Sequence, residues 1–332
     1  MAKVMAKGKK KSPVLITVLI VILAFVVAFS GFKVFQSLNN DNAQSDGDVK
    51  PTTKTVTVDG VDYFPRQDIT VMLLLGIDER GEVKKSESYN NTGENDMVAL
   101  AVFDEQDKTY SVLTLNRDTM MDIYTLGVTG KPAGKIYGQL ALAHTFGTGL
   151  EDSCENTVRT VSDFLSGVTV DYYLSMNMDA ISILNDAVGG VTVNVTDDFS
   201  KVDSSIPMGE VTLNGEQALS FVQTRKDVSD EMNISRMERH KEYMQSFVSA
   251  FNAKVKESDT FVLETYEKVS PYIVSDCSVN SMSNMLNDYA DYTLREVVSP
   301  AGESVLTSDY VEFYVDEEEL QKLIIRMFYK EK

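Results

Sequence analysis

The chain has 332 residues, of which 43% are hydrophobic and 24% charged, the balance of an ordinary globular protein with room for a sizeable core. Its formal net charge of -19 argues against a basic, phosphate-binding surface, so we expect no nucleic-acid partner. With only two histidines and two distant cysteines, the chain also lacks the residues for a histidine-rich or zinc-type metal site.

The N-terminal end predicts a membrane anchor. Residues 1–13 are a basic cytoplasmic segment, and residues 14–32 (VLITVLIVILAFVVAFSGF) contain no charge. An apolar helix of this length spans about 30 Å of hydrocarbon, so we expect one transmembrane helix. A cleaved signal peptide is the alternative, but the run is long for one and AFSGF is a poor cleavage site. Because lysines precede the span, the N-terminus is expected in the cytoplasm and the rest of this single-pass cell-membrane protein outside the cell.

Residues 33–67 are largely polar and predict a flexible extracellular stalk, followed by one folded domain over 68–332. Apolar runs at 69–76, 97–103 and 110–115 have the length of strands covered on both faces. The loop DEQDKT between the second and third runs is typical of a hairpin, so the three runs are expected to form an antiparallel meander.

Further along, predicted helices and strands alternate. The helices cover 155–167, 178–190, 213–225, 234–255 and 316–330, and the strands cover 170–176, 191–195, 295–299 and 311–315. This interleaving predicts an α/β domain, a three-layer α/β/α sandwich with a central mixed sheet. Cys154 and Cys277 match no metal-binding spacing, and either one disulfide or two free buried thiols is possible.

Charged residues lie at one edge of the predicted meander. Asp78 follows the first strand, Asp96 precedes the second, and Arg117 with Asp118 follows the third, so three separate segments converge there. Two carboxylates without a histidine or cysteine partner suit Mg²⁺, which prefers hard oxygen ligands. The alternative is that Asp78 caps a turn and Asp96 is a solvated loop residue.

Arg117 offers a planar fork that suits phosphate oxygens, and Asp118 could orient this fork or accept a proton from a nucleophile. A simple ion pair at a strand end is the alternative. In the predicted helix over 234–255, Arg236, Arg239 and His240 share one face through i, i+3 and i, i+4 spacing. A solvated charged face is the other interpretation of that helix.

The segments LLLGIDER, NDMVALAVFD, LTLNRDTMMDI, DAVGGV and LNGEQAL resemble, in this order, the LytR-CpsA-Psr family of cell-envelope proteins. The resemblance implies a phosphotransferase that takes a glycopolymer, such as a teichoic acid or capsule, from a polyprenyl-pyrophosphate carrier and joins it to peptidoglycan. It also implies a long apolar pocket for the lipid tail. The implied site consists of catalytic Arg117 and Asp118, Mg²⁺ at Asp78 and Asp96, and pyrophosphate held by Arg117, Arg225, Arg236, Arg239 and His240.

Four positions depart from the family pattern. Glu94 and Gln223 stand where the family commonly has arginine, Asn233 replaces an aspartate, and His240 replaces a glutamine. At least two phosphate-binding cations are therefore missing. The alternatives to transfer are a protein that binds polyprenyl phosphate or regulates without turnover, and a pyrophosphatase that acts on the lipid carrier.

Overall fold

The structure is a computed structural model that describes residues 55–58, 60–224, 227–228, 239, 242–243, 245–247, 249–251, 253–254, 257–258, 260–277, 289, 292–307 and 310–331. The predicted cytoplasmic segment, the transmembrane helix predicted over 14–32 and most of the predicted stalk lie outside these residues. Within the described ranges, no helix is both long enough and apolar enough to cross a bilayer.

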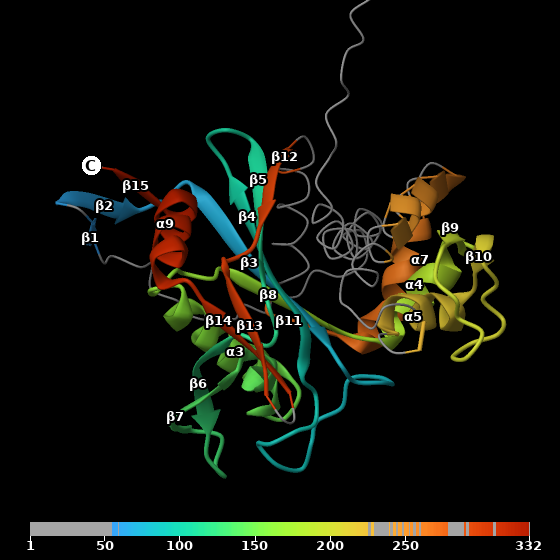
Figure 1. The fold of residues 1–332 in the computed structure, drawn as a ribbon, viewed down its shortest axis with the longest axis horizontal. Helices are drawn as coiled ribbons and strands as arrows, with labels where there is room; N and C mark the ends of the chain where they lie inside the picture. Colours follow the sequence, from blue (N-terminus) through green and yellow to red (C-terminus); the bar gives the residue numbers. More distant parts are fainter. Residues whose placement is uncertain are drawn as a thin grey trace, which may run out of the picture.

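A six-stranded mixed sheet in the order β11-β8-β3-β4-β5-β12 forms the centre of the molecule (Figure 1). β3 (Ile69–Ile77), β4 (Asn95–Asp104) and β5 (Thr109–Leu115) form the predicted antiparallel meander. The other strands are β8 (Tyr172–Asn177), parallel to β3, β12 (Thr293–Val298), parallel to β5, and β11 (Ile273–Ser275), antiparallel to β8. The prediction of a central mixed sheet is confirmed.

Both faces of this sheet are buried, which explains why its strands are apolar without strict alternation. Val71 and Leu73 of β3 face a large core that includes residues of α3 (Glu151–Phe164) and α9 (Glu317–Phe328). The intervening Met72 faces a smaller core on the other side, because side chains alternate along a strand.

The two cysteines lie on opposite faces of the sheet. Cys154, a residue of α3, belongs to the large core, and Cys277 belongs to the smaller core on the other face. Both are buried free thiols, which decides between the two alternatives that the sequence allowed.

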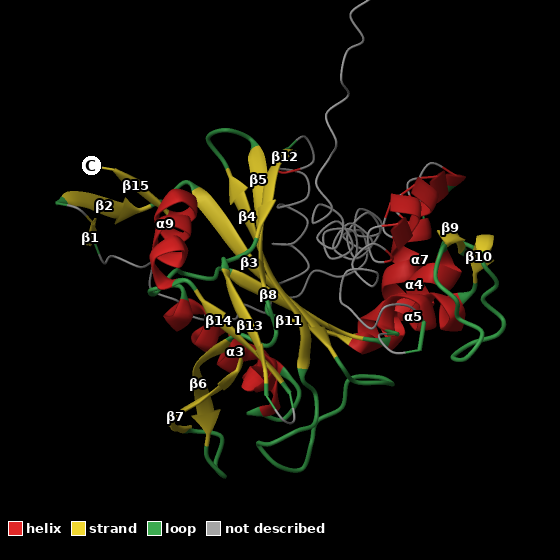
Figure 2. Ribbon diagram, in the orientation of Figure 1, coloured by secondary structure: helices red, strands yellow, loops and turns green. Residues whose placement is uncertain are grey.

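A second group of elements has a hydrophobic core of its own at the end of the sheet away from α9 (Figures 1 and 2). Its members are α4 (Asp179–Ala187), β9 (Val191–Val195), β10 (Gly209–Leu213), α5 (Gly215–Gln223) and α7 (Phe261–Val269). α5 begins with a capping box, in which the Asn214 and Gln217 side chains each accept from the other residue's backbone N–H at 3.0 Å. The predicted sandwich is therefore wrong for α4 and α5, which bury their apolar faces around this separate core rather than as an outer layer on the sheet.

The start of the folded body also differs from the prediction. β1 (Val56–Val58) and β2 (Val61–Pro65) lie inside the predicted stalk and form a three-stranded sheet with β15 (Tyr329–Glu331). Gly60, at φ +80°, makes the tight turn between β1 and β2 possible. The folded body therefore includes β1 and β2, which lie before the boundary predicted at residue 68.

Two hairpins and two short 3₁₀ helices complete the described elements. They are β6 (Met120–Leu126) with β7 (Pro132–Gln139), β13 (Gly302–Leu306) with β14 (Val311–Val315), η2 (Leu140–Thr145) and η3 (Ser270–Tyr272).

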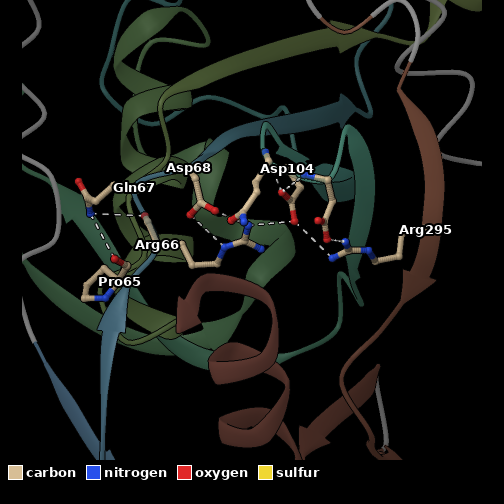
Figure 3. A network of polar contacts seen from close by, with 8 residues as sticks. Pro65, Arg66, Gln67, Asp68, Asp104 and Arg295 are labelled. Atoms are coloured by element: carbon tan, nitrogen blue, oxygen red, sulfur yellow. Dashed lines mark hydrogen bonds and ion pairs between the residues drawn. The ribbon is translucent and has the colours of Figure 1, made fainter. Parts of the chain in front are cut away.

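An ion-pair network holds the edge of the sheet where β3 begins and β4 ends (Figure 3). Arg66 contacts Asp68 and Asp104, each at 2.9 Å, and Arg295 of β12 contacts the same Asp104 carboxylate at 3.3 Å. Asp104 is largely buried, so two cations compensate a carboxylate that would be costly there alone. The charges of this network are therefore paired, and Arg295 also contacts Asp107.

Candidate active site

Arg117 lies at the edge of the sheet opposite this ion-pair network, two residues after the end of β5. Its guanidinium donates to the Asp96 and Glu94 carboxylates, and its Nε lies 3.7 Å from Oδ1 of Asp118. The side chain is only 17% exposed. Burial of the guanidinium opposes its charge, but Asp96 and Glu94 outweigh this effect and raise the pKa of Arg117.

The sheet register explains how these residues meet. Ile77, the last residue of β3, pairs with Asn95 at the start of β4, and the N–H of Asp78 donates to the Glu94 carbonyl at 2.9 Å. β4 in turn pairs with β5 up to Leu115. The structure therefore brings Asp78, Asp96, Arg117 and Asp118 to one edge of the sheet, as the order of the strands predicted.

The loop after β5 is held by its own polar groups. The Asn116 side chain accepts from the N–H of Asp118 at 3.0 Å, and the Asn116 carbonyl accepts from the Thr119 hydroxyl at 2.6 Å. Gln139 donates to the Asp118 carboxylate at 3.3 Å, and the Asp118 carbonyl accepts from the N–H of Phe313 at 2.9 Å. Asn116 and Gln139 thus fix Asp118 from both sides, a role that the sequence did not reveal.

The edge is rich in anions and offers hard oxygen donors. Three carboxylates, from Glu94, Asp96 and Asp118, surround the single guanidinium of Arg117. Asp78, which is exposed, adds a fourth carboxylate. The described residues contain no group of three or more histidine, cysteine or acidic side chains arranged to hold a metal by themselves. The donor set still fits Mg²⁺, which commonly takes one or two carboxylates and completes its shell with substrate phosphates and water.

Arg239 lies elsewhere, in the core shared by α4 and α5, and is 3% exposed. Its Nε donates to the Phe221 carbonyl at 2.9 Å, and its terminal nitrogens donate to Asp197 and to the Thr224 carbonyl. These contacts give Arg239 a packing role and provide no support for its predicted contact with pyrophosphate. The other predicted phosphate ligands, Arg225, Arg236 and His240, lie outside the described residues.

Arg80 is a cation near this edge that the sequence analysis missed. It follows Asp78 by two residues, pairs with Asp179 at the start of α4, and lies 3.4 Å from Glu216 of α5. It therefore joins the loop after β3 to the second group of helices. Its proximity to Asp78 is local in sequence, but its pairing with Asp179, nearly 100 positions away, shows in no local sequence pattern.

Comparisons with known proteins give one consistent result. The sequence model of the LytR_cpsA_psr family matches residues 32–327. The polyisoprenyl-teichoic acid–peptidoglycan teichoic acid transferase TagU of Bacillus subtilis (strain 168) is 26% identical over 288 residues, which cover 85% of this chain and 84% of TagU.

Solved structures show the same fold. Protein gbs0355 from Streptococcus agalactiae is similar with a TM-score of 0.61 at 24% identity, covering 78% of this chain and 88% of that one. A structure of TagT bound to LI-WTA is similar with a TM-score of 0.55 at 22% identity, covering 79% of this chain and 90% of that one. Because the family model extends over most of its length, the chain belongs to the LytR_cpsA_psr family.

Proposed function

We propose that this protein is a membrane-anchored phosphotransferase of cell-wall assembly. It would transfer a glycopolymer from a polyprenyl-pyrophosphate carrier to peptidoglycan outside the cell. The proposal rests on the guanidinium of Arg117, which is held between Asp96 and Glu94. Asp78 and Asp118 lie at the same edge of the sheet. The curated relative is named for teichoic acid transfer to peptidoglycan, which supports the substrate class.

Arg117 would bind the pyrophosphate. Its guanidinium is positioned before any substrate arrives, so little side-chain freedom remains to be lost on binding. Asp96 and Glu94 orient it, and both compete with phosphate oxygens for its N–H groups. Mg²⁺ at Asp78 and Asp96, when bound, would neutralise charge on the pyrophosphate and its leaving group.

Asp118 would act as the general base. It accepts the proton of the acceptor hydroxyl as that oxygen forms a bond to the phosphorus that carries the glycopolymer. The bond from this phosphorus to the bridging oxygen breaks, and polyprenyl monophosphate leaves with the electron pair. Gln139 and the Asn116 turn hold Asp118 in place for this step.

Glu94 supports the main alternative. It places an anion on Arg117 where the family commonly has a cation, which weakens the attraction of this edge for phosphate. A weaker hold on the charge that develops on the leaving group would slow the reaction more than it weakens binding of a lipid monophosphate, so a protein that binds polyprenyl phosphate without turnover is the main alternative. A pyrophosphatase that transfers to water is the other.

One reaction separates these functions. The membrane-anchored protein is incubated with lipid-linked glycopolymer and peptidoglycan, with and without Mg²⁺, and both polyprenyl monophosphate and wall-bound polymer are measured. Transfer requires both products in equal amounts. Monophosphate without wall-bound polymer would identify a pyrophosphatase, and neither product, together with measured binding of a polyprenyl-phosphate analogue, would identify a binding protein.

A further inference from the structure

A cleft with a volume of about 360 Å³ lies beside the candidate active site. The loop from Glu79 to Thr92 forms most of it, and the ends of β3 and β8 also line it. This volume is within the range of about 300 to 1,000 Å³ typical of small-molecule sites. Neither Arg117 nor Asp118 lines it, so it is separate from the edge described above.

The cleft nevertheless begins next to that edge. Ile77 lines it, and Asp78 is the following residue. On the other side Thr92, whose hydroxyl donates to the Glu79 carboxylate, precedes Glu94 by two residues. A ligand in the cleft would therefore extend toward the residues proposed to hold the pyrophosphate.

The polar side chains that line the cleft carry no net charge. Glu79 and Glu82 balance Arg80 and Lys84. His144 is held neutral because burial lowers its pKa to about 4. The remaining polar groups are amides and hydroxyls, from Asn90, Asn91, Asn177, Ser86, Thr92 and Ser175. Such a lining provides many hydrogen-bond donors and acceptors and little attraction for a phosphate, which a site with excess positive charge would attract.

Asn177 marks the bottom of the cleft as a binding position. Its side chain is more than nine-tenths buried, and its Nδ2 donates to the Gly81 carbonyl. Its Oδ1 has no hydrogen-bond partner among the described residues. A buried amide oxygen without a donor is unfavourable, so this atom is suited to accept a hydrogen bond from a ligand. Asn177 pairs in register with Ile77, which places this acceptor beside the strand that leads to Asp78.

We propose that this cleft binds an uncharged sugar ring of the substrates, with a hydroxyl or amide N–H of the sugar donating to Oδ1 of Asn177. Apolar contacts from Ile77, Val83 and Val274 would cover one side of the ring. The assignment rests on the proposed function for its substrate, but binding of the sugar can be measured without any transfer. The sugar belongs either to the acceptor or to the glycopolymer end of the donor, and these sources can be separated.

The first experiment measures binding to the protein with an unphosphorylated disaccharide of N-acetylhexosamines and, separately, with inorganic pyrophosphate. Thr92→Trp fills the mouth of the cleft. Thr57→Trp is its control, because Thr57 is also exposed and also donates to a carboxylate, that of Asp62 on the small sheet. We expect Thr92→Trp to lose disaccharide binding, with pyrophosphate binding unchanged and Thr57→Trp like wild type. Unchanged disaccharide binding, or an equal loss for pyrophosphate, would overturn the proposal.

A second pair of variants tests the bottom of the cleft. Asn177→Leu removes the acceptor, and Asn156→Leu is matched to it, because Asn156 is also buried with an unpartnered Oδ1 but lies away from the cleft. Among variants with a cooperative thermal melt, Asn177→Leu should weaken disaccharide binding about fivefold or more, the scale of one hydrogen bond. Equal weakening in both variants would contradict the assignment of Asn177.

The transfer reaction distinguishes a sugar of the acceptor from a sugar of the donor. If the cleft holds the acceptor sugar, Thr92→Trp loses transfer to peptidoglycan but keeps any release of polyprenyl monophosphate to water. If it holds the donor sugar, both reactions slow together while pyrophosphate binding stays normal. A wild-type protein that binds the disaccharide but transfers nothing would refute the proposed function and leave the sugar site standing.

Discussion

The guanidinium of Arg117 donates to the carboxylate of Asp96, so the residue predicted to bind phosphate and the residue predicted to bind metal are already in contact. The two roles are therefore coupled. Mg²⁺ bound to Asp96 would compete with Arg117 for the Asp96 carboxylate. A phosphate bound to Arg117 would compete with Asp96 for the guanidinium. Substitutions at either residue should alter both affinities.

Arg117→Lys tests the fork. Lysine keeps the charge, but a single ammonium cannot reproduce the planar set of donors that now reaches both Asp96 and Glu94. We expect a loss of about 1.5 to 3 kcal/mol in affinity for a polyprenyl-pyrophosphate analogue, the range for hydrogen bonds to charged groups. Titration of both proteins measures this, and a thermal melt verifies folding. Equal affinities would leave Arg117 as a strand-end ion pair only.

Asp96→Ala tests the proposed metal site. Removal of this carboxylate should abolish Mg²⁺-dependent turnover, because Asp78 alone would remain of the two proposed ligands. The melt should remain cooperative, since Asp96 lies at the sheet edge and outside the hydrophobic core. Glu105→Ala, at the opposite edge of the sheet beside Thr70, is a suitable control. Full Mg²⁺-dependent activity of the Asp96 variant would exclude the two-carboxylate site.

Glu94→Gln tests the departure from the family pattern. The substitution preserves the shape of the side chain and removes one of the three negative charges around Arg117. Affinity for inorganic pyrophosphate should rise by about 1 kcal/mol at low salt and by less at high salt, because the site is partly exposed and screened. Isothermal titration at two ionic strengths measures the change. A weaker affinity would show that Glu94 supports phosphate binding through the orientation of Arg117.

His144 predicts a pH dependence of stability. Its ring is 2% exposed, its Nδ1 donates to the Gly93 carbonyl at 2.9 Å, and burial lowers its pKa from 6.5 to about 4. Between pH 6.5 and 4 the unfolded chain binds the proton and the folded chain does not, so stability falls as the pH falls through this window. The contribution of His144 reaches roughly 3 kcal/mol at the lower end.

Urea denaturation of wild type and His144→Asn at pH 7 and pH 4.5 isolates this contribution. Asparagine keeps a donor for Gly93 and does not titrate, so the variant should lose less stability than wild type between the two pH values. The same loss in both proteins would mean that His144 does not remain neutral in the folded state.

The orientation in the membrane stays a prediction and has a direct test. Protease added to intact cells should cut the polar segment before residue 55 and release the folded body, because the lysines before the apolar span keep the N-terminus inside. A cytoplasmic marker protein should remain intact in the same cells. Protection of the body would reverse the orientation and exclude an extracellular acceptor.

The meander and the convergence of the site were predictable because they follow from local patterns. The apolar runs of β3, β4 and β5 and the hairpin loop after Asp104 determine which strand ends share an edge. The pairing of β2 with β15 was not predictable, since its partners are separated by almost the whole domain and β2 is only half buried.

The cleft could not be predicted from the sequence for a related reason. Its loop is shaped by Asn91, whose Nδ2 donates to the carbonyls of His144 and Gly147 at 2.9 and 3.1 Å. A single amide that bonds irregular backbone far along the chain has no periodicity to detect. The predicted sandwich was wrong at α4 and α5, which pack around a separate core. The sequence pattern of an amphipathic helix indicates that one face is buried but not which element covers that face.

The sheet of β1, β2 and β15 sets an order on events during synthesis. Its first two strands are synthesised before the central sheet, but β15 follows all the other described elements. A two-stranded hairpin is at best marginally stable alone. The pairing of β2 on this side therefore stays incomplete until β15 has been synthesised, and a nascent chain that stalls before Tyr329 would expose an unpaired strand edge.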